Sequence, residues 1–208
     1  MKRLYSTIVA ILDIKNVKLQ EALSMPSEFG GAGPLGLRDA VIAPHPDGSG
    51  SWVVSPSDQL KVLIQAGRIE VQDFSLVKPE KSKVPDLLEK FLGKASVGVT
   101  AVGLNHDLEL APNEDARQKI ATHFMAPWVG KAFQKSGATE VGGALRFLFR
   151  DNRGSWQIHV TPVVRSNAIR LTSNLERKDL VIKQSTIADA WQDSLDALEG
   201  YLKQLKLS

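Results

Sequence analysis

Two runs in which large apolar side chains recur at every second position, joined by a short turn, constrain the fold of this chain most strongly. The runs cover 145–150 and 155–161, and the sequence Asp-Asn-Arg-Gly at 151–154 is typical of the turn between them. The recurring apolar residues are Leu145, Phe147, Phe149, Trp156, Ile158 and Val160. Because successive side chains of a strand point to opposite faces, the pattern predicts a β-hairpin with an aromatic and aliphatic face in the core and a polar face outside.

Shorter apolar runs predict further strands. These cover 8–12, 52–54, 61–65, 68–74, 96–110 with a bend at Gly103, and a segment around 169–172. The runs 61–65 and 68–74 are expected to form a second hairpin, since Ile69 and Val71 alternate with polar residues.

Helices are expected between the strands. Pro85 is predicted to open the first helix and Gly93 to end it. Asn113 is predicted to cap a second helix. Pro127 is expected to kink or restart that helix, and Gly137 to end it.

The last helix is expected to begin at a Thr186 cap and to carry an apolar stripe. The stripe residues, spaced four, three, four and three apart, are Trp191, Leu195, Leu198, Leu202 and Leu205. Such a stripe predicts packing against the chain's own sheet, and a coiled-coil seam with a partner is the alternative.

The order of these elements predicts an α+β protein with two layers, a mainly antiparallel sheet and packed helices. Gly50-Ser51-Trp52 recurs as Gly154-Ser155-Trp156, and each copy leads from a turn into a strand and on to an amphipathic helix. The recurrence suggests two similar halves of three strands and a helix each. The halves are 1–95 and 96–208, the second with a helical insertion at 113–136, and they are expected to form one compact unit.

The composition excludes several classes of site. The chain has 208 residues and no cysteine, which rules out disulfides, zinc–thiolate sites, iron–sulfur clusters and cysteine nucleophiles. Its net charge of +3 is too small to indicate a nucleic-acid or membrane partner by itself. The longest apolar runs are too short for a membrane span, and the run at 8–12 is too short for a signal-peptide core. A cytoplasmic protein with no membrane partner and no cofactor is therefore expected.

A short motif lies on the long predicted strand. The sequence Gly103-Leu104-Asn105-His106 is preceded by Val99 and Val102, with a helix before it and a hairpin and C-terminal helix after it. In this layout the chain resembles a sporadically distributed, uncharacterised family of bacterial proteins with a Gly-Leu-aromatic-Asn strand motif. The chain departs from that motif because no tyrosine precedes the asparagine. The resemblance implies a bacterial cytoplasmic protein and assigns no catalytic residue.

The polar face of the 145–161 hairpin is the main candidate binding surface. The turn is expected to set Arg146 opposite His159. With Val160 opposite Ile169 on the next strand, Arg170 is expected beside His159 as well. The candidate anion- or partner-binding residues are Arg146, Arg150, Arg153, His159 and Arg170.

This candidate surface is rich in positive charge. Residues 145–178 hold seven Lys or Arg and two acidic residues, a charge of +5 that exceeds that of the whole chain. Arginine suits carboxylate and phosphate groups, so the surface could bind an acidic protein or nucleic acid. The alternatives are an ordinary solvated face or one covered by the acidic side of the last helix. Because the aromatic residues point inward, stacking on bases is not expected, which disfavours nucleic acid.

A second polar cluster comprises His106, Asp107 and Glu109. Strand alternation puts Asp107 and Glu109 on one face, where two carboxylates beside a histidine could bind a divalent metal or transfer protons. No second histidine stands at metal-ligand spacing, so a solvated strand edge is the favoured interpretation. The glycines at 30, 31, 33 and 36 lack the lysine that a phosphate-binding loop requires, and they predict a surface loop.

Three functional hypotheses follow. The first is a binding or assembly protein that contacts another protein or a second copy of itself. The second is a nucleic-acid- or anion-binding protein that uses the arginine-rich face. The third is an enzyme around His106, Asp107 and Glu109, or around Arg146 and His159. No catalytic residue and no metal site is assigned.

Overall fold

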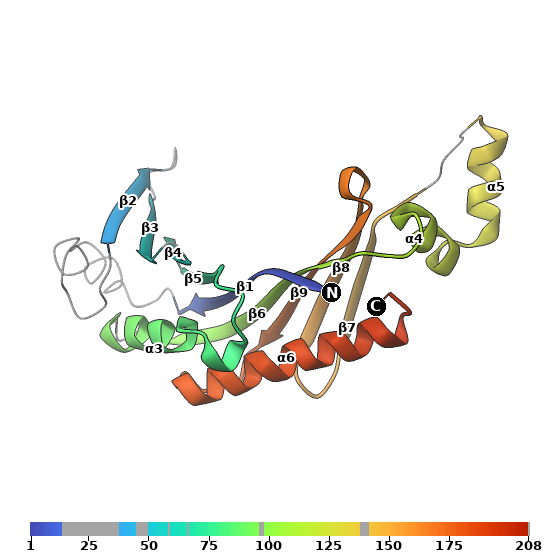
Figure 1. Ribbon diagram of the computed structural model, residues 1–208. Helices are drawn as coiled ribbons and strands as arrows, with labels where there is room; N and C mark the ends of the chain where they lie inside the picture. Colours follow the sequence, from blue (N-terminus) through green and yellow to red (C-terminus); the bar gives the residue numbers. More distant parts are fainter. Residues whose placement is uncertain are drawn as a thin grey trace.

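The strands that can be described form one sheet of nine strands, with helices against one face (Figure 1). The computed structural model describes residues 1–13, 38–44, 50–57, 59–65, 67–95, 98–137 and 142–207. The strands are β1 Lys2–Leu12, β2 Arg38–Pro44, β3 Gly50–Ser57, β4 Leu60–Gln65, β5 Arg68–Asp73, β6 Val99–Leu110, β7 Leu145–Arg150, β8 Ser155–Val163 and β9 Ala168–Arg177. The helices are η1 Pro79–Lys81, α3 Val84–Ala95, α4 Ala116–Phe124, α5 Pro127–Lys135, η2 Val164–Ser166 and α6 Gln184–Gln204.

The two predicted halves of the chain, 1–95 and 96–208, meet at the centre of the sheet, where β1 lies beside β6. The strand order of the sheet is β2-β3-β4-β5-β1-β6-β9-β8-β7, and every neighbouring pair is antiparallel. Helices α3 and α6 lie along one face (Figure 1). The predicted α+β class, with two layers and an antiparallel sheet, is confirmed.

The two halves follow similar paths through the sheet. In each, the last strand (β5 or β9) returns beside the first (β1 or β6) and a helix follows. The shared tripeptide does not map onto this layout, however. Trp52 lies on β3, three strands from β1, whereas Trp156 lies on β8, two strands from β6. The duplication therefore stays a prediction.

The β7–β8 hairpin has the predicted register. Leu145, Phe147 and Phe149 lie opposite Val160, Ile158 and Trp156 respectively. The three β8 side chains are buried, whereas those of β7 are only partly buried and Phe149 is 36% exposed. The difference arises because β7 is at the edge of the sheet and has only β8 as a neighbour among the described strands.

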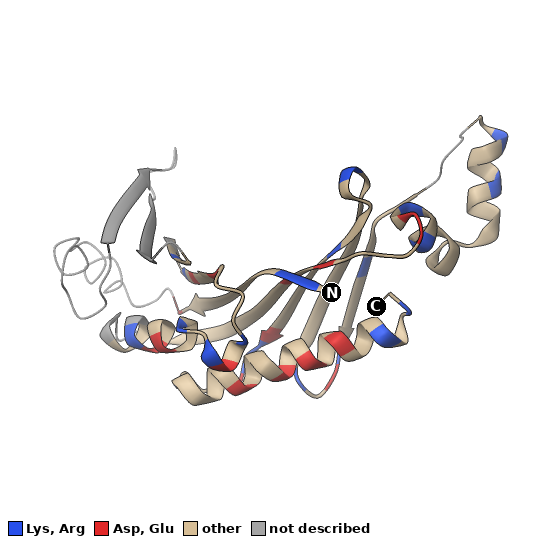
Figure 2. Cartoon of the chain, in the orientation of Figure 1, with Lys and Arg blue, Asp and Glu red and all other residues tan. Residues whose placement is uncertain are grey.

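The C-terminal helix packs on its own sheet, as the apolar stripe predicts. Trp191, Leu195, Leu198 and Leu202 are buried in the same core as the sheet residues. Acidic residues lie along the helix in Figure 2. The predicted Thr186 cap is wrong. The helix begins at Gln184, whose backbone N–H donates to the Glu89 carboxylate of α3 at 2.6 Å, so a tertiary contact provides the cap.

Other predicted ends shift for local reasons. Asp115, not Asn113, caps α4, because its carboxylate accepts the backbone N–H groups of Arg117 and Gln118. Helix α3 continues past Gly93 to Ala95. Pro127 starts a separate helix, α5, as predicted. No helix in the described ranges is long and apolar enough to cross a bilayer.

Candidate functional site

The sheet has a covered face and an open face. The covered face packs against α3 and α6 (Figure 1), and α4 joins them because Phe124 contacts the Phe147 ring, with 5.9 Å between centroids. The open face carries the alternate side chains, on the side away from α6. Polar residues from five strands therefore share it, although they are far apart in the sequence.

A hollow of about 270 Å³ lies on the open face, and we call it the open-face groove. Its side chains come from β1, β5, β6, β8 and β9. They are Tyr5, Thr7, Glu70, Asn105, Asp107, Gln157, His159, Thr172 and Asn174. The groove therefore spans the centre of the sheet and the predicted hairpin face.

One end of the groove is set by a buried carboxylate with an arginine partner. Asp107 is 3% exposed, and Arg170 donates to it from two nitrogens, with Nη2–Oδ2 at 2.6 Å and Nε–Oδ1 at 3.0 Å. Tyr5 lies opposite Asp107 on β1. Burial, and then the charge and hydrogen bonding of Asp107, raise the pKa of the Tyr5 hydroxyl. The Arg170 guanidinium therefore balances the charge of Asp107, and the Tyr5 hydroxyl stays protonated beside that carboxylate.

At the other end, Arg146, Gln157 and His159 form a hydrogen-bonded chain. Arg146 Nη2 donates to Gln157 Oε1 at 2.9 Å, so the amide nitrogen of Gln157 faces the His159 Nε2 at 2.6 Å. Since an amide nitrogen only donates, His159 Nε2 accepts and the imidazole proton resides on Nδ1. This hydrogen bond favours the tautomer of His159 whose Nδ1–H is a donor.

Asn105, which lines the groove, has a side-chain acceptor with no partner among the described residues. Its Oδ1 atom is buried, and Asn105 lies opposite Asn174 on β9. A buried polar atom without a partner costs free energy.

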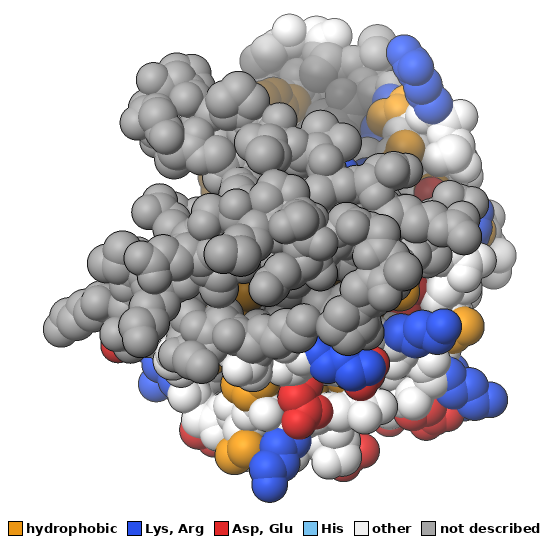
Figure 3. Space-filling view, turned by 90° about the vertical axis from the view of Figure 1, so that its left-hand side faces the viewer, with side chains coloured by type: hydrophobic (Ala, Val, Ile, Leu, Met, Phe, Trp, Pro, Cys, Tyr) orange, Lys and Arg blue, Asp and Glu red, His pale blue; other side chains and the backbone are white. Residues whose placement is uncertain are grey.

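The charges that line the groove are paired within the protein. Asp107 pairs with Arg170, and the Glu70 carboxylate accepts from Arg68 and from Gln72 Nε2. At the end of the molecule shown in Figure 3, lysine or arginine side chains likewise alternate with acidic ones over the described surface. The groove thus presents neutral donors and acceptors rather than a field of one sign.

The structure brings only some of the predicted site residues together. Arg146 lies opposite His159, as predicted. Arg170 lies opposite Thr161, one row from His159, because Val160 pairs with Leu171 instead of Ile169. The shift by two residues arises because β8 continues through Val163, which pairs directly with Ala168 across the short η2 turn.

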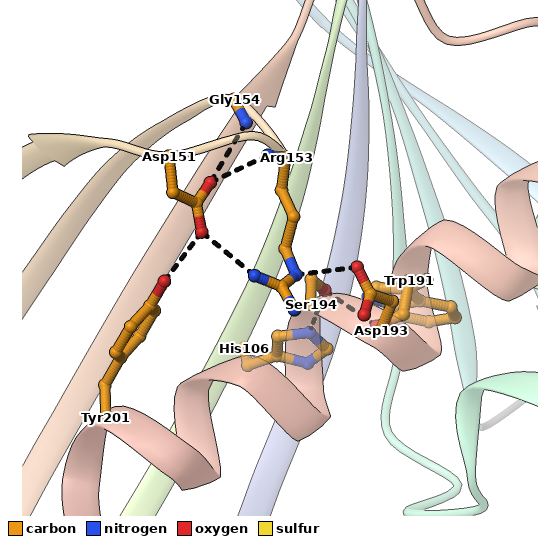
Figure 4. Close-up of polar contacts among 8 residues, drawn as sticks. All are labelled: His106, Asp151, Arg153, Gly154, Trp191, Asp193, Ser194 and Tyr201. Atoms are coloured by element: carbon orange, nitrogen blue, oxygen red, sulfur yellow. Dashed lines mark hydrogen bonds and ion pairs between the residues drawn. The ribbon is translucent and has the colours of Figure 1, made fainter. Parts of the chain in front are cut away.

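The other two predicted arginines lie at the hairpin tip, outside the groove. Arg150 Nε donates to Ser155 Oγ at 3.2 Å. Arg153 bridges the hairpin to α6, with Asp151 at 3.1 Å and Asp193 at 2.8 Å (Figure 4). Tyr201 of α6 also donates to Asp151, at 2.6 Å. Although burial opposes ionisation, these hydrogen bonds lower the pKa of Asp151 to about 2. Arg153 thus has a structural role.

The predicted solvated strand edge at His106 and Asp107 is wrong, because β6 lies at the centre of the sheet. The His106 imidazole is 1% exposed and points to the covered face, where it hydrogen-bonds Ser6 and Ser194 and stacks on Trp191 (Figure 4). Burial, followed by the charge of Arg3, lowers the pKa of His106 to about 3, so it is neutral. Asp107 and Glu109 do share the open face, as predicted.

His159 and Asp107, the imidazole and the buried carboxylate of the groove, do not contact each other. His159 and Asp107 lie in one row with Thr172 between them, so they are two strand spacings apart, about 10 Å. That separation is too long for a direct hydrogen bond between a base and its orienting carboxylate. In the part of the chain that the structure describes, no three His, Asp or Glu residues are placed to hold a metal ion. The glycine-rich segment 30–36 lies outside the described residues.

Sequence reasoning missed Tyr5, Thr7 and Glu70 as groove residues. The first strand is longer than predicted and includes Tyr5 and Thr7, which alternate with core positions. Glu70 is one of the polar residues that alternate with buried residues along β5. These signals give the face of each residue, but not which strands are neighbours.

Comparison with known proteins adds no relative. The sequence matches no protein-family model, and no curated protein matches it significantly. The resemblance to an uncharacterised bacterial family therefore stays a prediction.

Proposed function

We propose that this chain is a binding protein that holds an uncharged polar segment of another protein in the open-face groove. The observation that carries the proposal is the content of the groove: amide, hydroxyl and imidazole groups, with each carboxylate paired to an arginine. Polypeptide main chain is a row of neutral donors and acceptors, and such a row complements these groups.

The state of individual groups supports this partner. Asn105 and Asn174 line the groove, and the His159 Nδ1–H and the second amide hydrogen of Gln157 can donate to carbonyl oxygens. Asn105 lies on β6, Gln157 and His159 on β8 and Asn174 on β9, and each of these strands has a neighbour on both sides.

The nucleic-acid alternative has less support. Arg153 and Arg170, two of the four arginines on which it depends, form ion pairs within the chain. Phosphate binding gains from unpaired cations that release counterions, and internal pairing removes part of that gain. The aromatic residues of β7 and β8 are on the covered face, where Phe149 and Trp156 pack with Tyr201 and Phe147 packs with Phe124.

The proposal is tested by nuclear magnetic resonance on ¹⁵N-labelled protein. The probe is a pool of capped, uncharged octapeptides, and the signals read are the side-chain amide groups of Asn105, Gln157 and Asn174. We expect concentration-dependent shifts of these signals. We expect Asn105→Ala to weaken binding by about tenfold, the effect of one or two hydrogen bonds.

Asn113→Ala is the matched control, because Asn113 is exposed and does not line the groove. It should bind the peptides as the wild type does. Inorganic phosphate and a (dT)₁₀ oligonucleotide serve as anionic probes. Shifts with the anions alone would overturn the proposal in favour of the arginine-face alternative, and no shift with the peptides would also refute it.

A further inference from the structure

Arg146, Gln157 and His159 form a triangle of side chains at the hairpin end of the open face. Arg146 on β7 lies opposite His159 on β8, and Gln157 lies two residues before His159, on the same face. The Gln157 amide joins the other two side chains: its Oε1 accepts from Arg146 Nη2 at 2.9 Å, and its nitrogen lies 2.6 Å from His159 Nε2. An amide fits this place because one of its ends accepts and the other donates.

This pattern of hydrogen bonds requires a neutral imidazole. When a histidine takes up a proton, both of its ring nitrogens become donors. The His159 Nε2–H would then point at the amide nitrogen of Gln157, which cannot accept it. Turning the amide over would bring its nitrogen against Arg146, which is also only a donor. Either orientation of the amide therefore leaves one neighbour facing another donor.

We propose that Arg146 and protonated His159 form a binding site for an oxyanion, a carboxylate or phosphate group, which takes the place of the Gln157 amide between them. An oxyanion only accepts hydrogen bonds, so it can accept from the guanidinium and from the imidazolium together. Directly opposite residues of antiparallel strands have Cβ atoms about 5 Å apart, so the two cations repel each other unless an anion lies between them. Binding of the anion therefore brings one proton onto His159.

The other groups that face His159 leave the charge of the anion to this pair. Thr172 faces His159 from β9 and carries no charge. Arg170 lies one row away on β9, and Asp107 lies beyond Thr172, about 10 Å from His159. Arg170 and Asp107 are paired with each other. Arg146, by contrast, pairs with no carboxylate within the described part of the chain, so its charge is available.

Sulfate is the probe for this site, because it only accepts hydrogen bonds and keeps its charge between pH 5.5 and 7.5, a range in which histidine titrates. Nuclear magnetic resonance follows the side-chain amide of Gln157 and the ring of His159. We expect sulfate to shift both signals at pH 5.5. Because a proton is taken up with the anion, the affinity should weaken as the pH rises, by up to about tenfold per pH unit. No shift at pH 5.5, or an affinity that does not change with pH, would overturn the proposal.

Substitutions give a second measurement. Arg146→Ala and His159→Gln each remove one cation and should weaken sulfate binding at pH 5.5 by at least about tenfold. Gln157→Ala removes the competing amide and should strengthen it. Arg150→Ala is the matched control, an arginine of the same strand at the hairpin tip, where it donates to Ser155. It should bind sulfate as the wild type does. An equal loss in Arg150→Ala would show a diffuse positive surface and would overturn the site.

Two further probes at pH 5.5 distinguish the sources of the oxyanion. A capped octapeptide with one glutamate presents a carboxylate on a polypeptide, and inorganic phosphate presents a free anion. Tighter binding of the glutamate peptide than of the uncharged pool would identify an acidic side chain of a bound segment, and binding of phosphate alone would identify a small anion. Either result supports the site, and binding of neither would overturn it. The sulfate experiment does not depend on what the rest of the groove binds, so this inference and the proposed function can fail separately.

Discussion

His106 and Asp107 are neighbours on β6 and both are buried, yet the two faces of the sheet treat them in opposite ways. On the covered face, His106 is kept neutral by burial and is held between two serine hydroxyls. On the open face, Asp107 is compensated by the Arg170 guanidinium, which is 47% exposed. At these two positions the covered face holds a neutral imidazole and the open face holds a paired charge, and both arrangements avoid an uncompensated buried charge.

The largest expected effect concerns the covered face. Trp191 is 1% exposed, so Trp191→Ala should lower the free energy of unfolding by about 3–5 kcal/mol. Trp128 is 71% exposed, so Trp128→Ala should change it by less than about 0.5 kcal/mol. Urea unfolding followed by circular dichroism measures both. Equal losses of unfolding free energy in the two variants would contradict the assignment of Trp191 to the core and Trp128 to the surface.

A second test uses pH. Histidine in the unfolded chain titrates near 6.5, whereas burial lowers the pKa of His106 to about 3 in the folded protein. Between these values the unfolded chain takes up a proton that the folded chain does not. The contribution of neutral His106 to the free energy of unfolding is therefore fully present above pH 6.5. It is lost as the pH falls, by at most about 1.4 kcal/mol per pH unit.

This pH dependence should be measured by urea unfolding between pH 7 and 4.5, above the range in which Asp151 titrates. His106→Gln should flatten the dependence. A wild-type slope that survives His106→Gln would show that His106 is not the group responsible.

The third test removes the charge compensation of the open face. Arg170→Ala leaves the buried Asp107 without its partner, and it should cost about 1–3 kcal/mol after allowance for the exposed guanidinium. Arg146→Ala is the control and should cost less than about 0.5 kcal/mol, because Arg146 is exposed. Adding Asp107→Asn to Arg170→Ala should recover much of the loss. If Arg170→Ala is as mild as the control, the ion pair does not compensate Asp107.

Features that depend on local sequence were predictable. The alternation of Trp156, Ile158 and Val160 defines the buried face of β8, and the short turn sets the β7–β8 register. The predicted β8–β9 register is wrong because the register depends on where β8 ends: the alternating run stops at 161, whereas the strand continues through Pro162 to Val163. The α6 cap was wrong because it comes from Glu89, 95 residues earlier in the chain.

The groove was only half predictable for the same reason. Gln157, Thr172 and Asn174 lie on β8 and β9, which follow one another in the chain, so strand alternation is enough to place them on the face that carries His159. Tyr5 and Asp107 meet through the β1–β6 pairing, which joins distant parts of the chain and leaves no periodic signal. Strand alternation gives the face of a residue, whereas only the sheet order gives its neighbours.

The central claim is that the open-face groove binds through neutral hydrogen-bonding groups, with its charges already paired. The most direct measurement is the shift of the Asn105 side-chain amide signal on addition of the uncharged octapeptides, repeated at 50 and 300 mM salt. We predict the same shift and the same affinity at both concentrations. A shift that disappears at 300 mM, or that occurs only with phosphate, would contradict the claim.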